Sequence, residues 1–251
     1  MSNTNNEFLD LFHNDNFIYI FNDKDQKIVY NKKLKKKTVI RFEKDKEEEV
    51  SKFSGLENFE LIVNNLKKLS SLRIPNMVNY ISDGTRNNRK YYEVDFIESN
   101  LNDLISNKNE LQYKEFIEIF VELLYTIMLF RKYNYQNRNI NINTIGYIID
   151  TKVRTYIIDD NITIKINNLI HPIITNFDNG IFEIYDQDNE DNYCDTDQLQ
   201  DSLLKLLEIV SVKTVQTDFI QSIFDMFGND DLTSNYITNV LKFLISNYDK
   251  E

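Results

Sequence analysis

The sequence predicts an α+β protein in which a small β-rich part is followed by a larger, mainly helical part. Short β-type runs with alternating apolar residues fill residues 17–42, and one amphipathic helix pattern follows at 56–72. After residue 98 the apolar residues follow a helical spacing over longer segments. We expect an N-terminal tail at 1–16 and a single domain with lobes at 17–98 and 99–251, a length that can bury a substantial core.

The N-terminal lobe is predicted to have the order β-β-β-α-β-β. The first three strands are expected at 17–21, 27–30 and 38–42, and residues 22–25 (NDKD) have the composition of a hairpin turn. The helix at 56–72 has apolar residues three and four positions apart, and Pro75 prevents its continuation. Two further strands are expected at 77–81 and 90–97, joined by a turn at Asp83 and Gly84.

The C-terminal lobe is predicted to form around one long helix at 112–133. Apolar residues cover more than one face of this segment, which is typical of a helix buried on several sides. A short helix at 101–105 precedes it, and residues 139–185 are rich in Ile and Tyr and indicate short strands. An acidic loop at 186–197 leads to helices at 199–212, 219–227 and 232–248.

Composition and charge exclude several classes of function. The chain has 29 Lys and Arg against 40 Asp and Glu, a net charge of −11, which is unfavourable for binding nucleic-acid phosphates. A basic run at 32–37 is followed by acidic residues at 43–49 and is expected to be a solvated turn. The single Cys194 excludes an internal disulfide, and with only His13 and His171 we expect no metal site.

The remaining features suggest a soluble intracellular protein. No apolar run reaches the roughly 18 residues of a membrane span, and the polar N-terminus lacks the layout of a signal peptide. Ala and Trp are absent while Asn and Ile are abundant, a bias that indicates an AT-rich genome and carries no functional meaning.

Four segments, taken in their order along the chain, resemble a protein kinase. Residues 74–80 (IPNMVNY) resemble the passage into the fourth strand, and residues 91–105 resemble the fifth strand, the hinge and the next helix. Residues 133–145 stand where the catalytic loop follows the long helix, and residues 170–180 resemble the strand that enters the metal-binding loop. The Tyr- and Ile-rich insert at 147–168 is similar to one in kinase-like proteins of giant DNA viruses.

The resemblance implies positions for the catalytic base and the metal ligands, and the residues there are unsuitable. Asn139 takes the place of the catalytic Asp, and Thr144 takes the place of the metal-binding Asn. No Asp or Glu occurs from Leu129 to Ile149, so a shifted alignment does not supply a base. Asn176 replaces the metal-binding Asp, although magnesium prefers anionic oxygen, and Asp178 remains as an alternative ligand.

The nucleotide-binding positions of the resemblance also differ. Arg41 stands in place of the third-strand Lys, and Glu60 is either its partner or an ordinary surface residue. No glycine precedes Gly55, so a glycine-rich phosphate loop is absent. Asp197, or Asp195, matches the acidic residue that braces the catalytic loop of a kinase, or it is a helix N-cap.

A kinase scaffold with an altered centre implies a pseudokinase, a catalytically inactive module that binds other proteins. We expect no cofactor, no metal, no nucleic-acid or membrane partner, and a place in a viral assembly in the host cytoplasm or the virion. Two alternatives stay open: an atypical active phosphotransferase that uses Arg41 and Asp178, and a purely structural virion component.

Overall fold

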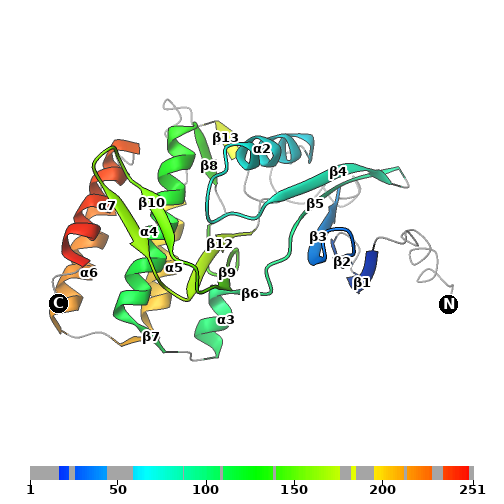
Figure 1. Ribbon diagram of the computed structural model, residues 1–251. Coiled ribbons are helices and arrows are strands. Elements are labelled where there is room, and N and C mark those ends of the chain that lie inside the picture. The colour runs from blue at the N-terminus through cyan, green and yellow to red at the C-terminus, as the bar shows by residue number, and fades with distance from the viewer. Residues whose placement is uncertain are drawn as a thin grey trace, which may run out of the picture. The chain divides into compact units, whose positions relative to one another are not determined.

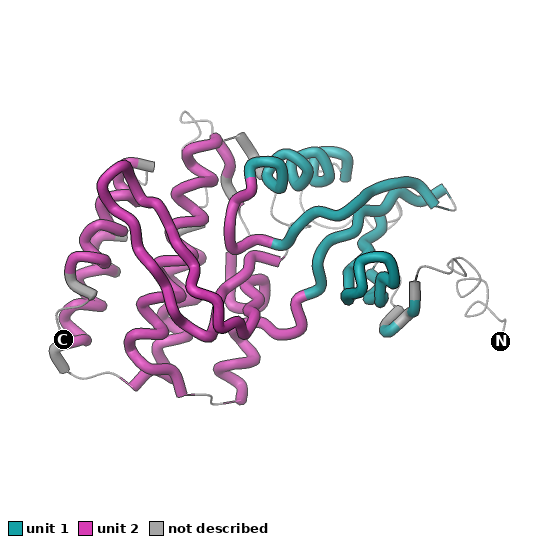
Figure 2. The backbone as a smooth tube through the Cα atoms, viewed as in Figure 1, with its two compact units in different colours: residues 1–72, 78–96 teal, residues 73–77, 97–251 magenta. Residues whose placement is uncertain are grey.

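The computed structural model describes residues 17–22, 26–43, 59–86, 88–107, 110–137, 140–175, 182–184, 195–211, 214–227 and 234–248. Its helices and strands are labelled in Figure 1. The chain divides into two compact units, coloured separately in Figure 2. Unit 1 contains residues 1–72 and 78–96, and unit 2 contains residues 73–77 and 97–251. The change of unit after residue 96 lies two residues before the lobe boundary expected from the sequence.

Unit 1 contains one five-stranded sheet and one helix. The strands are β1 (Phe17–Asn22), β2 (Gln26–Asn31), β3 (Lys36–Phe42), β4 (Tyr80–Arg86) and β5 (Arg89–Asp95). Their order is β1-β2-β3-β5-β4, and all neighbours are antiparallel. The helix α2 (Phe59–Ser71) packs on the sheet, with the Phe59 ring 5.6 Å from that of Tyr92. The first three strands confirm the alternating patterns of the sequence.

The alternation along β3 gives this sheet two different faces. Ile40 lies directly between Lys27 of β2 and Glu93 of β5, whereas the next residue, Arg41, lies opposite Tyr92. Side chains directly opposite one another share a face of the sheet. Because Tyr92 contacts α2, Arg41 lies on the helix side, and Lys27 and Glu93 lie on the other side.

The connection between β4 and β5 differs from the prediction. Asp83 and Gly84 lie inside β4, and the turn comes later, where Asn88 has a φ of 62°. Asn adopts this left-handed conformation more readily than most residues. Gly84 permits a close approach instead, since a Cβ atom there would be 3.1 Å from the ring of Tyr91 across the strand pair.

The helices of unit 2 are α3 (Leu101–Ser106), α4 (Tyr113–Lys132), α5 (Asp195–Leu207), α6 (Thr214–Phe227) and α7 (Ser234–Tyr248). α4 is buried on several sides, as predicted, and Leu124 near its middle is 0% exposed. α3 begins with a capping box in which Asn100 and Asp103 each accept a hydrogen bond from the other's backbone N–H. In the described part of the chain, no helix combines the length and apolar character needed to cross a membrane.

The strands of unit 2 form several small sheets. β12 (Ile170–Ile174), β9 (Ile145–Ile149) and β6 (Ser99–Asn100) form a three-stranded sheet, and β10 (Arg154–Ile157) and β11 (Thr163–Ile166) form a hairpin. Two further pairs are β13 (Phe182–Ile184) with β8 (Tyr135–Asn137) and β14 (Val210–Ser211) with β7 (Leu111–Gln112). The hairpin lies on α4, with the Tyr156 and Tyr125 rings 5.1 Å apart (Figure 1).

Residues 73–77 belong to unit 2, although they follow α2 directly in the sequence. Met77, predicted to begin a strand of the first lobe, pairs instead with Ile174 in an isolated parallel bridge. The segment turns at Asn76, which has a φ of 59° and a buried side chain. Its amide group donates a hydrogen bond to the carbonyl oxygen of Glu122 in α4 at 2.9 Å. This buried polar anchor accounts for the late start of β4.

Candidate functional site

The segment between α4 and β9 is where the kinase resemblance places the catalytic loop. Thr144, in the position of the metal-binding Asn, is 7% exposed at the end of this segment. Its hydroxyl accepts a hydrogen bond from the Asn141 N–H at 2.9 Å and donates one to the Asn141 carbonyl oxygen at 3.1 Å. Its carbonyl oxygen accepts hydrogen bonds from the N–H and hydroxyl of Thr175, at 2.9 and 3.0 Å. Thr144 therefore stabilises the turn into β9 and offers no anionic oxygen.

A side chain of α5 contacts the same segment, but it is not the predicted one. The Oε1 atom of Gln198 accepts a hydrogen bond from the backbone N–H of Ile140 at 2.8 Å. The resemblance assigned this bracing role to Asp197 or Asp195, whose side chains lie outside the described part of the structure. The adjacent neutral amide therefore makes the described contact, which ties the start of α5 to the loop after β8.

Several predicted site residues fall outside the part of the chain that the structure describes. These are Asn139, Asn176 and Asp178, together with the first hairpin turn at 23–25. Thr175 is the last described residue before the predicted metal-binding loop. Among the described residues, no group of three or more His, Cys, Asp and Glu side chains is placed to hold a metal ion.

Arg41 and Glu60, the predicted nucleotide-binding pair, both belong to unit 1. Arg41 is half-buried on the sheet face that α2 covers. Glu60 lies in the first turn of α2 and forms an ion pair with Lys90 of β5, with Nζ and Oε1 2.5 Å apart. This hydrogen bond lowers the pKa of the Glu60 carboxyl. Lys90 is therefore a described partner of Glu60, in the same unit.

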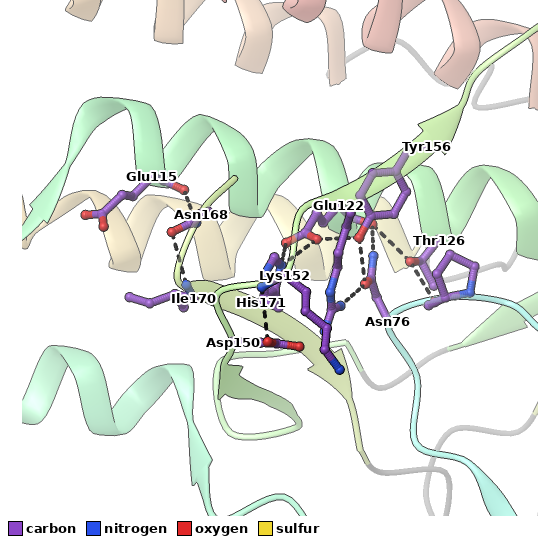
Figure 3. Close-up of polar contacts among 12 residues, drawn as sticks. Asn76, Glu115, Glu122, Thr126, Asp150, Lys152, Tyr156, Asn168, Ile170 and His171 are labelled. Carbon is purple, nitrogen blue, oxygen red and sulfur yellow. Dashed lines mark hydrogen bonds and ion pairs between the residues drawn. The ribbon is translucent and has the colours of Figure 1, made fainter. Parts of the chain in front are cut away.

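Unit 2 contains a buried polar network that the sequence did not predict, drawn in Figure 3. Glu122 of α4 and His171 of β12 are both 0% exposed, and the His171 Nδ1 atom lies 3.0 Å from Oε1 of Glu122. The hydroxyl of Tyr156, from the β10–β11 hairpin, donates a second hydrogen bond to Oε1 of Glu122. Burial raises the pKa of Tyr156, and the Glu122 charge raises it further. One carboxylate thereby joins a helix, a sheet strand and the inserted hairpin.

Asn76 extends this network to the segment before β4. Its side-chain oxygen accepts a hydrogen bond from Arg154 Nη1 at 3.0 Å and lies 3.1 Å from the Tyr156 hydroxyl oxygen, whose single hydrogen is donated to Glu122. On α4, the Thr126 hydroxyl lies 3.2 and 2.9 Å from the carbonyl oxygens of Pro75 and Glu122 and can donate its hydrogen to either of them. The Nε2 atom of His171 is buried and has no hydrogen-bond partner among the described residues. Apart from the half-buried Arg154, the residues of the network are buried, and their arrangement indicates a structural clamp.

The sequence did contain a signal for this network. Glu122 stands between Val121 and Leu123 in the most apolar helix of the chain, where a carboxylate needs a buried partner. The partners come from sequence positions 34 and 49 residues away, so no local pattern identifies them.

No protein-family profile and no curated protein matches the sequence. Solved structures do match: the crystal structure of the Rad53 kinase domain and SCD2 in complex with AMPPNP has a TM-score of 0.55 and 13% sequence identity. That match covers 91% of this chain and 90% of the other. A second crystal structure of the Rad53 kinase domain and SCD2 matches with a TM-score of 0.55 and 12% identity, over 91% and 89% of the two chains. The chain therefore has a protein-kinase-like α+β fold.

Proposed function

We propose that this protein is a pseudokinase, a catalytically inactive kinase-like module that acts by binding other proteins. The observation that carries the proposal is the composition of the segment between α4 and β9. α4 ends at Lys132 and β9 begins at Ile145, and the chain between them contains no Asp or Glu. A kinase needs a carboxylate in this segment to orient the attacking hydroxyl. This absence does not depend on the exact alignment.

The contacts of Thr144 support the same proposal. In a kinase, the residue at this position supplies an amide oxygen to a magnesium ion. The Thr144 hydroxyl is shorter and forms hydrogen bonds to both backbone polar groups of Asn141. Using it as a metal ligand would break contacts that shape the turn into β9. The scaffold is kept, and the groups expected to hold metal and base are replaced.

A phosphoryl-transfer assay with radiolabelled ATP and magnesium tests the proposal. The wild type is incubated with a mixed protein substrate and compared with an Arg41→Met variant purified in the same way. We expect no transfer above background in either sample. Equal weak signals in both would identify a contaminating kinase. Transfer by the wild type that disappears in the variant would overturn the proposal and favour the atypical phosphotransferase.

We further propose that the partner belongs to a viral assembly. The similarity of the insert at 147–168 to viral kinase-like proteins supports this step, and the AT-rich composition agrees with such a source without bearing on function. Quantitative mass spectrometry of purified virions and of infected-cell cytoplasm tests it. Stoichiometric amounts in virions would favour the structural component, whereas a defined complex in the cytoplasm would favour the scaffold. Absence from infected cells would contradict both.

A further inference from the structure

A surface pocket in unit 2 combines acidic and aliphatic side chains. It lies where the end of α5, strand β14 and the connection from α3 to β7 meet, and its volume is about 450 Å³. We name it the acidic pocket, and it is lined by Ile105, Glu110, Glu208, Ile209, Val210 and Ser211. These described lining residues include two carboxylates and no Lys or Arg, so the pocket offers negative charge beside an aliphatic surface.

Backbone hydrogen bonds hold the walls of the acidic pocket in place. Strand β14 pairs in parallel with β7, and the carbonyl oxygen of Ile209 accepts a hydrogen bond from the Leu111 N–H at 2.9 Å. The N–H of Glu208 donates to the carbonyl oxygen of Lys205 at 3.2 Å and so continues the last turn of α5. The three aliphatic lining residues are half-buried, whereas both glutamates are exposed. The pocket is therefore formed before a partner arrives, and its aliphatic part is incompletely covered.

Unit 1 carries a surface of opposite charge, the turn between β2 and β3. We name residues 32–35 (KKLK) the lysine turn, and all four side chains are exposed. Leu34 is 41% exposed and lies between lysines on both sides. The Oδ1 atom of Asn31 accepts a hydrogen bond from the Leu34 N–H at 3.1 Å, and Lys35 has a φ of 55°. The turn therefore has a defined backbone that presents one aliphatic side chain among positive charges.

From these two surfaces we infer that the lysine turn of one copy of the protein docks in the acidic pocket of a second copy. Leu34 enters among the aliphatic side chains, and the neighbouring ammonium groups face Glu110 and Glu208. A cavity of about 450 Å³ is in the size range of sites that enclose small ligands, so it accommodates a Leu side chain. An apolar anchor in a pocket supplies binding energy, and complementary charges around it fix the register.

The contact has a consequence for the form of the assembly. The lysine turn and the acidic pocket are different surfaces, so the interface is heterologous, and association continues past two copies unless a ring closes. The net charge of −11 on each copy opposes association, so we expect assembly only at raised protein concentration. Self-association of this kind does not depend on whether the chain transfers phosphate.

Sedimentation velocity of the full chain over a range of concentrations tests the inference. We expect the weight-average mass of the wild type to rise with concentration. Reversing the charges on either surface should raise the Kd by about tenfold or more, because like charges then face each other. The two reversed proteins are Lys33→Glu/Lys35→Glu and Glu110→Lys/Glu208→Lys. Leu34→Gln should also weaken association, and circular dichroism checks that each variant is folded.

A mixture of the two reversed proteins gives the sharpest comparison. One of them keeps a native acidic pocket and the other keeps a native lysine turn, so the mixture should associate at concentrations similar to the wild type. Two control proteins change the net charge by the same amounts at exposed positions elsewhere: Lys152→Glu/Lys165→Glu and Asp160→Lys/Asp218→Lys. Each control should associate like the wild type, and mixing the two controls should add nothing.

Several results would overturn the inference. A wild type that stays monomeric up to its solubility limit excludes the contact, as does association that neither charge reversal weakens. Reversed proteins that fail alone and also fail when mixed would show that the two surfaces do not face each other. Loss of association on reversal of the pocket but not of the turn would show that the pocket accepts another segment, so the lysine turn would be the wrong occupant.

Discussion

At the scale of single residues, Glu122 shows how one buried charge can organise distant parts of a chain. Its carboxylate contacts His171 and Tyr156, and its carbonyl oxygen contacts Asn76. All four residues are less than 5% exposed. A buried carboxylate with several hydrogen-bond donors is tolerated, whereas one that loses its partners becomes costly.

Replacing Glu122 by Ala should therefore destabilise the protein by about 3–5 kcal/mol, because the His171 and Tyr156 groups are left buried without their acceptor. Glu122→Gln keeps the shape and both kinds of hydrogen bond, so it should cost clearly less. Urea denaturation monitored by circular dichroism gives both values. Lys114→Gln, at an exposed position of the same helix, is the control. Equal losses for Ala and Gln would contradict the role given to the network.

At the scale of elements, α4 is the centre of unit 2. Its buried residues include both apolar and acidic side chains, and α5, α7 and strands β7, β8, β12 and β14 contact it. The helix was predicted to be buried on several sides, and the complete burial of Leu124 confirms this.

Leu124→Ala should destabilise the protein by about 2–5 kcal/mol, as expected when a buried Leu leaves a cavity. Leu204→Ala is the matched control, since Leu204 of α5 is 47% exposed and should change stability by less than about 0.5 kcal/mol. Thermal and chemical denaturation of the three proteins provide the comparison. A cost at Leu124 no larger than that at Leu204 would contradict the buried position of α4.

The inserted hairpin is fastened to α7 by an ion pair with a defined pH dependence. Asp159 lies 2.6 Å from Nζ of Lys242, and this hydrogen bond lowers the pKa of the Asp159 carboxyl. A carboxyl whose folded pKa is lowered stabilises the fold above its unfolded pKa of about 3.9, and this contribution is lost as the pH falls through the folded value.

Asp159→Asn should therefore lower the denaturation midpoint at neutral pH, and its difference from wild type should shrink as the pH falls below about 4. The side chain also accepts hydrogen bonds from the N–H groups of Asn161 and Ile162, both at 2.9 Å, which Asn can partly keep. Asp160→Asn alters the same turn and should show a much smaller pH-dependent difference. A difference for Asp159→Asn that is constant from pH 7 to pH 3 would exclude the ion pair as its source.

At the scale of the whole molecule, the kinase-like fold and the proposed lack of catalysis rest on different residues. The fold depends on buried apolar periodicity and on caps such as Asn100. Phosphoryl transfer would depend on a few carboxylates and glycines, and under the proposal these are the groups that the sequence replaces. Loss of such groups leaves the buried core unaffected, so a scaffold can persist without phosphoryl transfer.

Magnesium-ATP should give no rise in melting temperature at millimolar ligand. No glycine precedes Gly55, so backbone amides cannot approach phosphates closely, and Asp23 and Asp25 in the first hairpin turn would repel them. A thermal shift titration checks this expectation, with magnesium chloride alone as the control. A rise of several degrees that requires both magnesium and ATP would contradict it.

Restoring carboxylates at Asn139 and Asn176 together should still give no phosphoryl transfer. The Thr144 hydroxyl remains bound to the Asn141 backbone, and the phosphate loop is still missing. The double variant should also have a lower denaturation midpoint, since two carboxylates without a cation repel each other. Asn143→Asp, at an exposed position of the same loop, should change the midpoint less. Activity in the double variant would show that the rest of the site is functional.

The sequence by itself determined the elements and the class of fold. Periodicity of two predicted β1 to β3, and periodicity of three and four predicted α2 and α4, because local alternation reflects which side is buried. It placed the start of β4 three residues too early. Met77 does not join β4, because it forms a bridge to Ile174, which lies 97 positions away in the sequence. It also assigned a turn to Asp83 and Gly84, where the glycine instead makes room for the ring of Tyr91.

Only the tertiary structure decided which polar residues meet. Gln198 rather than Asp197 makes the described contact to the loop at Ile140, Lys90 pairs with Glu60, and Glu122 is shared by His171 and Tyr156. Polar contacts depend on distance and burial across the fold, which local sequence patterns do not record. The spacing of apolar residues, in contrast, can be seen within each helix or strand, because each element has to bury its own apolar face.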